Sequence, residues 1–486
     1  MKDSLYFLQK SEENMPSLFT REVRLPVRKS KLKMGDSFVL DLGDHCVGHF
    51  SFRFDVSDDF ISAPIRLIIR FGEDMREIED DFTSFHGSIS AVWLQEEVLV
   101  LDHPQEVNMP RRYSCRYIKI TVENARRPLE LFQFCFRATT SADMTKLCPS
   151  TTSDPLLAQI DAVGTKTLKE CMQRFLEDGP KRDRRLWIGD LRLEALTNYY
   201  TFQNSEVVKR CLYLIAAGER DALGFVPSYI YETPYFFSGR DHIADYALLF
   251  VTAVCDYFEH TQDVDTVNDL LALCKLQLDS FYAILDERGI VTPQKGWFFF
   301  IDWCPDLKGR IALQGVYLYT LERFAALLDA LGDGDREKYE TRLHKGRTAS
   351  LTHLFDAERG IFVNDLDHGQ VSVHSQVWMI LGGVIDGEVA KRALSLTQND
   401  PQAKQPFTPY MRHYVIEAMM KLGMQDEAVA YLKEIWGGMI QKGADTFWEV
   451  YAPNDPDFSP YSDRKVNSLC HAWSCTPSYF IRKYNL

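Results

Sequence analysis

Two different spacings of apolar residues divide the chain. Up to about residue 140, apolar and polar residues alternate in short runs rich in β-branched and aromatic residues, separated by Gly, Pro, Asp and Asn. Because side chains alternate across a strand, such runs predict an antiparallel β-sandwich, to which we assign residues 1–145. The runs are SFVLDLG, CVGHFSFRFDV, IRLIIRFGED, EVLVLD, RYIKITVEN and ELFQFCFRA.

From Ser153 onward the apolar spacing becomes helical. The triplet Ser153-Asp154-Pro155 is typical of a helix cap followed by proline in the first turn, and an apolar stripe follows it. By the same criteria, further helices are predicted near 189–203, 205–218, 240–260, 264–286, 311–331, 335–355, 373–383, 387–396, 409–422, 425–441 and 466–483. Their short connections favour antiparallel hairpins.

About twelve helices in consecutive hairpins can close into a double ring, the (α/α)6 barrel. The same number of helices would also permit a helical solenoid. No fixed repeat period runs through the sequence, and its absence weakens the solenoid. We therefore predict that residues 146–486 form an (α/α)6 barrel, which carries the function.

Acids and aromatic residues gather in the connections between the predicted helices. Because connections at one end of a ring of hairpins converge on a common mouth, these segments can meet in space. Aromatic rings and carboxylates together suit a sugar, which stacks its C–H face on a ring and hydrogen-bonds through its hydroxyls. The segments are LEDGPKRDRRLWIGD (176–190), FVPSYIYETPYFFSGRDHIAD (225–245), GWFFFIDW (296–303), and DTFWEVY (445–451) with CHAW (470–473).

Each of these features alone has an ordinary structural explanation. An acid–arginine cluster at a helix start is most often a solvated network or a cap. Trp297, Trp303 and Trp448, taken singly, are typical of a core, and His471 is typical of a hydrogen-bonded core histidine. Their coincidence in the connections favours a binding site.

Glycosidic bonds are cleaved by two carboxyl groups, one protonated to assist the leaving group and one ionised to activate water or to attack. Asp183 and Glu449 are the candidates for this pair. The arginines beside Asp183 oppose the assignment, since a nearby positive charge lowers the pKa of a carboxyl group. Either these arginines pair instead with Asp178 and Asp190, or a neighbouring carboxylate and burial outweigh them. We expect the pairing, because the acids interleave with the arginines.

Composition narrows the classes of ligand. The 69 acidic and 55 basic residues give a formal charge of -14, which disfavours nonspecific binding to nucleic acid or to anionic membranes. No run approaches the ~18 apolar residues of a membrane span, and the first residues carry charges where a signal peptide is apolar. The 11 cysteines are scattered without C-x-x-C pairs, and motifs for phosphate loops, zinc proteases and serine nucleophiles are absent. We predict a cytoplasmic protein without metal or cofactor.

The run DGPKRDRRLWIGD, residues 178–190, is similar to the signature D-[CG]-x-x-R-[DE]-R-x-x-W-x-G-D of glycoside hydrolase family 78, the inverting α-L-rhamnosidases. The later segments TFWE and SLCHAWS resemble the general-base motif of that family and its following histidine. The runs DLGDHCVGHF and IRLIIRFGED resemble the β-sandwich that precedes its barrel. The resemblance covers nearly the whole chain.

The resemblance implies roles by position. Asp183 would be the general acid and Glu449 the general base acting through water, with the carboxyl groups about 6.5–9.5 Å apart to admit that water. The Trp and Phe residues around 297–303 would form an apolar corner for the methyl group of rhamnose. The match of Asp245 in DHIADYALL is loose. The residues placed in the substrate-binding site are Asp178, Arg182, Trp187, Asp190, Asp245, Asp302, Trp303, Trp448 and His471.

Two features depart from the family pattern. Most members carry Glu at the acid position, whereas Asp183 is shorter by one methylene. Many members continue into a second β-sandwich after the barrel, whereas this chain stops at Leu486. The first departure bears on the geometry of the general acid, and the second on contacts to the leaving group.

The sequence thus predicts a glycosidase that removes terminal α-L-rhamnose with inversion, and a small carbohydrate or rhamnosylated glycoside as its ligand. Two alternatives stay open: a catalytically inactive carbohydrate-binding homologue, and an (α/α)6 enzyme acting on a different glycoside. The sequence leaves open which aglycone is attached and whether the protein forms a homo-oligomer. We expect the N-terminal domain to buttress the barrel without touching substrate, because its strands carry no comparable cluster of acids and aromatic residues.

Overall fold

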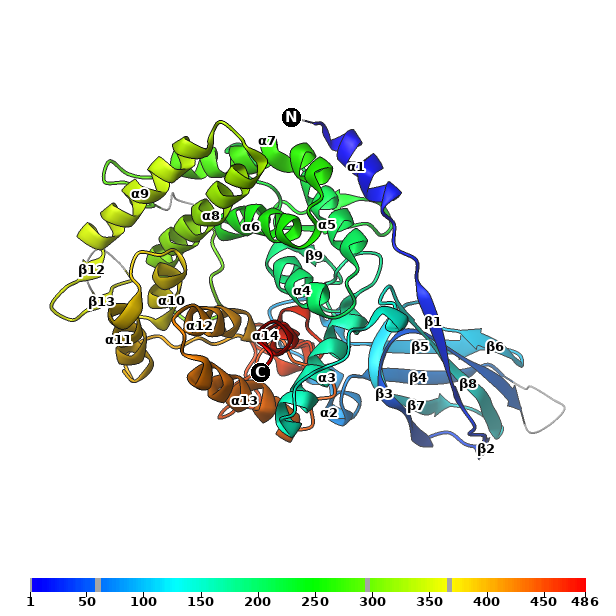
Figure 1. Cartoon of the computed structure of the whole chain (residues 1–486). Coiled ribbons are helices and arrows are strands. Elements are labelled where there is room, and N and C mark those ends of the chain that lie inside the picture. The colour runs from blue at the N-terminus through cyan, green and yellow to red at the C-terminus, as the bar shows by residue number, and fades with distance from the viewer. Residues whose placement is uncertain (1, 57–62, 293–297, 365–368) are drawn as a thin grey trace.

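The computed structural model describes residues 2–56, 63–292, 298–364 and 369–486. An antiparallel sheet domain is followed by a helical domain, as the two apolar spacings predict (Figure 1). The sheet domain contains β1 (Phe19–Leu25), β2 (Lys29–Leu32), β3 (Ser37–Val56), β4 (Ile65–Gly72), α2 (Met75–Glu79), β5 (Glu96–Leu101), β6 (Gln105–Asn108), β7 (Tyr113–Asn124) and β8 (Leu129–Thr140).

The long strand β3 organises the sheet domain. The strand order is β1-β8-β3-β7-β4-β5, with β2 paired to β8 and β6 to β3. The first half of β3 pairs with β7 and the second half with β8 and β6. The sheet encloses an apolar core that includes Phe50, Phe52 and Phe134.

Within the described residues, twelve helices make up the helical domain. Helices α4, α6, α8, α10, α12 and α14 form an inner ring, which the 3-10 turn Ala472–Ser474 completes between α12 and α4, and the other helices surround it. The helices are α3 (Pro155–Cys171), α4 (Ile188–Tyr200), α5 (Ser205–Ala217), α6 (Ala244–Thr261), α7 (Val264–Tyr282), α8 (Arg310–Leu331), α9 (Arg336–His353), α10 (Val373–Leu381), α11 (Gly387–Gln398), α12 (Pro409–Lys421), α13 (Gln425–Gln441) and α14 (Pro477–Tyr484).

The inner helices are buried over most of their surface because they contact neighbours on several sides. In α6 every residue from Ala244 to Phe258 is buried. The prediction of one last helix over 466–483 is wrong in its start. Only α14 is α-helical, and Pro477 stands in its first turn. The residues before it form the turns Arg464–Val466 and Ala472–Ser474 and an irregular segment.

An N-terminal helix, α1 (Ser4–Glu13), packs on the helical domain and not on the sheet (Figure 1). Phe7 is fully buried against Tyr213 of α5, and Arg210 donates a hydrogen bond of 3.0 Å to the carbonyl of Ser11. The assignment of residues 1–145 to the sandwich did not anticipate this helix. Its apolar residues, Leu5 to Leu8, are adjacent in sequence and show no helical spacing.

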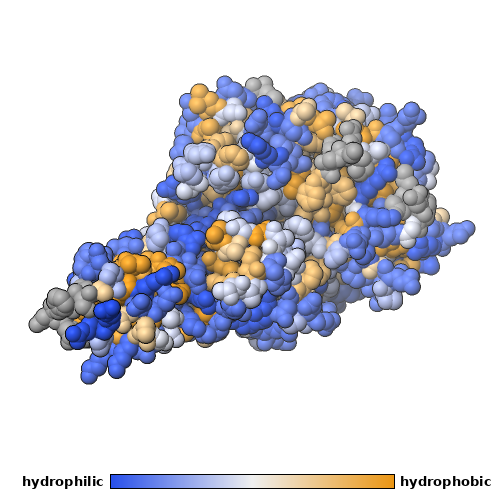
Figure 2. Space-filling model, turned by 180° about the vertical axis from the view of Figure 1, so that it is seen from behind, coloured by the Kyte–Doolittle hydropathy of each residue, from blue (hydrophilic) through white to orange (hydrophobic). Residues whose placement is uncertain are grey.

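The surface view from behind shows the sheet domain projecting from the helical domain as a separate lobe (Figure 2). Much of this surface is hydrophilic, with scattered apolar side chains. Among the described helices, none combines the length and apolarity needed to span a membrane.

Three short strands, β9 (Leu186–Trp187), β10 (Tyr229–Tyr231) and β11 (Phe237–Ser238), form a small sheet beside α4, and β12 (Phe355–Asp356) pairs with β13 (Ile361–Phe362).

A buried cluster of charges ties four inner helices together. Arg192 of α4 donates to Asp256 of α6 (2.9 Å) and to Tyr319 of α8 (2.6 Å), and Tyr319 donates to Glu417 of α12 (2.7 Å). All of this lies inside the ring, where an unpaired charge is costly. The cluster therefore holds the relative positions of these helices.

We expect Arg192→Met to lower the free energy of unfolding by about 3 kcal/mol, because it removes the positive charge that pairs with Asp256 and Glu417. Urea denaturation followed by circular dichroism measures the change. The matched control is Arg336→Met, whose ion pairs are exposed and whose expected effect is below about 0.5 kcal/mol. Equal effects of the two substitutions would contradict the prediction.

Candidate active site

The signature segment, residues 178–190, folds as a closed loop that leads into α4. The carboxylate of Asp178 accepts a hydrogen bond from the backbone N–H of Arg185 (3.0 Å), and the Asp178 N–H donates to the Arg185 carbonyl (3.0 Å). Between these ends, Asp183 and Arg184 have φ angles of 65° and 52°. Left-handed backbone at consecutive residues other than glycine is strained, and such strain is concentrated at functional sites. The loop leaves the side chain of Asp183 partly exposed.

Gly179 lets this loop approach the segment that precedes α14. A Cβ atom at position 179 would lie 2.9 Å from Ser468 Oγ and 3.2 Å from His471 Nδ1. The Ala472 N–H donates to the Asp178 carbonyl at 2.7 Å. Because Gly179 has no side chain, the signature loop can contact the segment around Ser468 to Ala472, almost 300 residues away in the sequence.

Glu449 lies buried beside the signature loop, with 1 % of its surface exposed. Its carboxylate accepts hydrogen bonds from the Arg182 guanidinium, from the hydroxyl of Tyr461 (2.6 Å) and from the backbone N–H of Ser468 (3.2 Å). Trp473 donates its indole N–H to the Glu449 carbonyl at 2.9 Å. Both carboxylate oxygens and the backbone are thus held in place.

Burial by itself would raise the pKa of Glu449. The opposite charge of Arg182, with His471 and the hydrogen bonds from Arg182 and Tyr461, outweighs burial and holds the pKa at about 2. The carboxylate is therefore ionised at neutral pH, the state that a general base requires.

One guanidinium joins the two predicted catalytic carboxylates. Arg182 Nη1 lies 3.5 Å from Asp183 Oδ1, and Arg182 Nη2 contacts Glu449 Oε2. Because the two terminal nitrogens of a planar guanidinium are about 2.3 Å apart, these oxygens lie within about 8 Å of each other. The structure thus brings together two residues that are distant in sequence.

The expected pairing of the arginines with Asp178 and Asp190 is wrong. Arg182 binds Glu449, and Arg185 offers Asp178 only its backbone N–H while its guanidinium stacks on Tyr229, 4.6 Å from the ring centroid. Asp190 faces His471 instead, with Oδ1 3.2 Å from Nε2. The closed loop brings a backbone N–H, and not an arginine side chain, to Asp178. The order of acids and arginines along the sequence could not indicate this contact.

The two outer acids of the signature have raised pKa values. Burial, together with the charges of Asp183 and Asp190, raises the pKa of Asp178 well above its usual range. Burial also raises the pKa of Asp190, although His471 opposes it. A raised pKa lets a carboxyl group hold its proton to higher pH, and a protonated carboxyl group can both donate and accept hydrogen bonds.

Asp245 and Asp302 have their oxygens occupied by protein donors. Asp245 accepts from the backbone of Phe300 (2.9 Å) and of Ile301 (3.0 Å). Asp302 accepts from His374 Nε2 (2.8 Å) and, at the start of α12, from Thr408 Oγ1 (2.6 Å). Both carboxylates anchor the loop that carries Trp303. Their predicted contact with a sugar stays a prediction.

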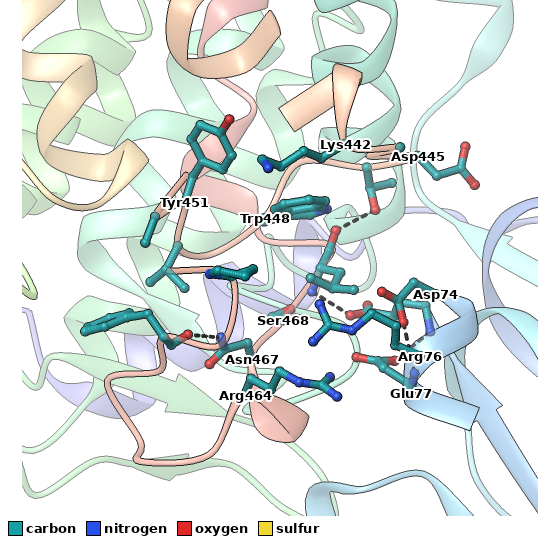
Figure 3. Close-up of a pocket in the computed structure, with 18 of the residues that line it drawn as sticks. Asp74, Arg76, Glu77, Lys442, Asp445, Trp448, Tyr451, Arg464, Asn467 and Ser468 are labelled. Carbon is teal, nitrogen blue, oxygen red and sulfur yellow. Dashed lines mark hydrogen bonds between the residues drawn. The ribbon is translucent and has the colours of Figure 1, made fainter. Parts of the chain in front are cut away.

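The predicted tryptophans have different neighbours. Trp303 lies beside Tyr461, with ring centroids 6.0 Å apart, and Trp187 packs on Tyr229 at 4.4 Å. Trp448 lines a cavity of about 310 Å³ whose lining includes neither Asp183 nor Glu449 (Figure 3). Trp297 lies outside the described residues.

Tyr461 is the residue near the carboxylates that the sequence did not indicate. Its hydroxyl binds Glu449, and its ring packs under the Arg182 guanidinium, 4.4 Å from the centroid. It stands in an irregular segment outside every motif, so no sequence signal singled it out. Among the described residues, no cluster of three or more His, Cys, Asp or Glu side chains could hold a metal ion.

A six-hairpin helical domain with two carboxylates near one arginine has the architecture of a glycoside hydrolase. Residues 20–139 match the model of the glycosyl hydrolase family 78 alpha-rhamnosidase N-terminal domain. Residues 148–484 match the bacterial alpha-L-rhamnosidase 6 hairpin glycosidase domain. The chain belongs to glycoside hydrolase family 78, the family of α-L-rhamnosidases, and the predicted family and fold are confirmed.

Solved structures agree with this membership. A rhamnosidase from Klebsiella oxytoca with rhamnose bound is 36% identical, with a TM-score of 0.95, and the match covers 100% of this chain and 99% of that one. The family 78 rhamnosidase of Bacillus sp. GL1 is 24% identical (TM-score 0.79; 94% of this chain, 47% of that one). The Streptomyces avermitilis α-L-rhamnosidase complexed with L-rhamnose is 17% identical (0.69; 96% and 44%). The last two show the fold alone. No curated protein sequence is significantly similar.

Proposed function

We propose that this glycosidase hydrolyses terminal α-L-rhamnosides with inversion, using Asp183 as general acid and Glu449 as general base. The observation that carries the proposal is the guanidinium of Arg182, which contacts Glu449 and lies 3.5 Å from Asp183. Rhamnose bound to the structure that is 36% identical supports this choice of sugar.

The two carboxyl groups differ in burial, and this difference suits two different steps. Glu449 is ionised and buried, so it can accept a proton from a water molecule as the water oxygen attacks the anomeric carbon. Asp183 is partly exposed, so it can donate its proton to the departing glycosidic oxygen and recover one from solvent. The water proton ends on Glu449, and the proton from Asp183 ends on the leaving alcohol.

The separation of the carboxyl groups bears on the stereochemistry. Inverting glycosidases keep their carboxyl groups about 6.5–9.5 Å apart, and retaining ones about 5–5.5 Å. The shared guanidinium places the two groups within about 8 Å of each other, a limit that includes the inverting range, and the anomer formed first distinguishes the two geometries.

The test is hydrolysis of a panel of aryl glycosides, with the first-formed anomer identified by proton NMR before mutarotation. We expect cleavage of the α-L-rhamnoside in preference to other glycosides and β-L-rhamnose as the first product. The α-anomer as first product would overturn inversion. Rhamnose binding by calorimetry without hydrolysis of any aryl glycoside would select the inactive homologue, and preference for another sugar would select the alternative enzyme.

We expect Tyr461→Phe to lower kcat about tenfold and to move the acidic limb of the kcat/KM profile to higher pH. The substitution keeps the ring under Arg182 and removes the hydroxyl that donates to Glu449, so the pKa of Glu449 rises. A base with a raised pKa becomes protonated, and so inactive, at a higher pH. Steady-state kinetics from about pH 2 to pH 8, a range that reaches the pKa of Glu449, measure the shift. An unchanged acidic limb would show that Tyr461 does not tune Glu449.

A further inference from the structure

A buried network of charges joins the sheet domain to the signature loop. Glu73 follows β4 and Glu77 lies on α2, whereas Lys181 belongs to the signature; each is at most 7 % exposed. Lys181 Nζ contacts Glu77 Oε1 and lies 3.9 Å from Glu73 Oε2. Burial of unpaired charges is costly, so these three groups restrict each other's positions.

Lys181 and its neighbour Arg182 hold three consecutive carbonyl groups of the barrel. Lys181 Nζ donates to the carbonyls of Lys465 (3.2 Å) and Asn467 (2.8 Å). Arg182 Nε donates to the carbonyl between them, that of Val466, at 3.1 Å. The residues 465–467 are therefore fixed against the signature loop through their backbone, whatever their side chains.

The next two residues connect this segment to both ends of the network. The Ser468 N–H donates to Glu449 Oε2 at 3.2 Å, and the Glu449 N–H donates to the Ser468 carbonyl at 2.9 Å. The Leu469 N–H donates to Glu73 Oε2 at 2.6 Å. The Glu73 carboxylate of the sheet domain thus accepts a hydrogen bond from Leu469, and the preceding residue, Ser468, donates to Glu449.

The sheet domain anchors Glu73 from its own side. Ser114 of β7 donates to Glu73 Oε1 at 2.8 Å, and His45 Nε2 lies 3.1 Å from Ser114 Oγ and 3.4 Å from the same Glu73 oxygen. His45 and Ser114 are fully buried. Burial would lower the pKa of His45, but Cys470 and Glu73 outweigh it and raise the pKa to about 9. Ser114 and His45 therefore hold Glu73 in place from within the sheet domain.

We propose that Glu73, Glu77 and Lys181 are positioning residues, which hold Arg182 and the Ser468 N–H against Glu449 from the sheet domain. The proposal rests on the assignment of Glu449 as general base. Figure 3 shows α2, with Glu77, and the segment of Asn467 and Ser468 around the same cavity. The sheet domain then contributes to catalysis through the orientation of the base and without contact to the substrate.

The acidic limb of the pH profile reports this positioning. The charged and titratable groups around Glu449 are Arg182, Tyr461, His471, Asp190 and, across the Arg182 guanidinium, Asp183. Among these, the Arg182 charge lowers the pKa of Glu449 most. If the network is loosened, Arg182 and the Ser468 N–H withdraw from the carboxylate, and its pKa rises.

The experiment compares Lys181→Met with the unchanged enzyme. We expect kcat to fall about 10- to 100-fold, KM to change less than about threefold, and the acidic limb of kcat/KM to move up by about one pH unit. Glu73→Gln is the second variant, because the amide keeps the shape of the side chain and removes its charge. Glu73→Gln should show the same shift of the acidic limb with a smaller fall in kcat. If Lys181→Met does not fold, the shift in Glu73→Gln alone tests the proposal.

Lys166→Met is the matched control. Lys166 of α3 also joins the two domains, through Asp44 and Asp445 (2.8 Å to the latter). Asp445 accepts from the backbone N–H of His45 (2.9 Å), so Lys166→Met removes a domain contact beside the network and leaves the contacts of Glu73, Glu77 and Lys181 in place. This control should leave kcat and the pH profile unchanged. The proposal is overturned if the two network variants keep the original acidic limb, or if Lys166→Met shifts the limb equally. Full activity of Glu449→Gln would instead refute the assignment of the base, which is a separate result.

Discussion

Glu449→Gln is expected to lower kcat on an aryl α-L-rhamnoside by at least about 10³-fold. An amide cannot accept the proton of the attacking water, and no other described carboxylate has the same contacts with Arg182, Tyr461 and Ser468. The loss should persist at every pH, because no titration restores a base to a glutamine side chain.

The fold should survive this substitution. The amide oxygen of Gln can still accept from Arg182 or from the Ser468 N–H, and its NH2 can donate to Tyr461. Circular dichroism and thermal unfolding check that the variant is folded, and Glu434→Gln, an exposed residue of α13, is the control for the same chemical change. A kcat within tenfold of the original enzyme would contradict the role of Glu449.

Asp183→Asn is expected to have the second largest effect, and its size should depend on the leaving group. Protonation of the glycosidic oxygen matters most when the departing alcohol is weakly acidic. We therefore expect a fall in kcat of about 10³-fold for an alkyl rhamnoside and about tenfold or less for a nitrophenyl rhamnoside. Steady-state kinetics on the two substrates give the comparison.

Asp183→Glu is the control for the position of this carboxyl group. It restores an acid and adds one methylene, so it should retain far more activity on the alkyl rhamnoside than Asp183→Asn. Equal losses on both substrates for Asp183→Asn would show that the residue does not act as the proton donor. The left-handed backbone at Asp183 is common to both variants and so does not explain a difference between them.

Much of the fold could be predicted because its signals are local. The twelve helices of the helical domain follow from the spacing of apolar residues, and the sheet domain follows from alternation. The elements that the sequence did not predict correctly have weak local signals. Helix α1 is held by its contacts with α5, and the segment before α14 is held by hydrogen bonds to Asp178, Lys181 and Glu73.

The sequence by itself determined the family of this protein, the order of its two domains and the acids of its signature. These depend on residue types at fixed spacings. Only the tertiary structure decided that Arg182 binds Glu449, that Tyr461 donates to the base, and that Trp448 lines a cavity without Asp183 or Glu449. The physical reason is that Arg182 and Glu449 stand 267 positions apart, and their contact depends on how loops from separate hairpins and from the sheet domain pack together.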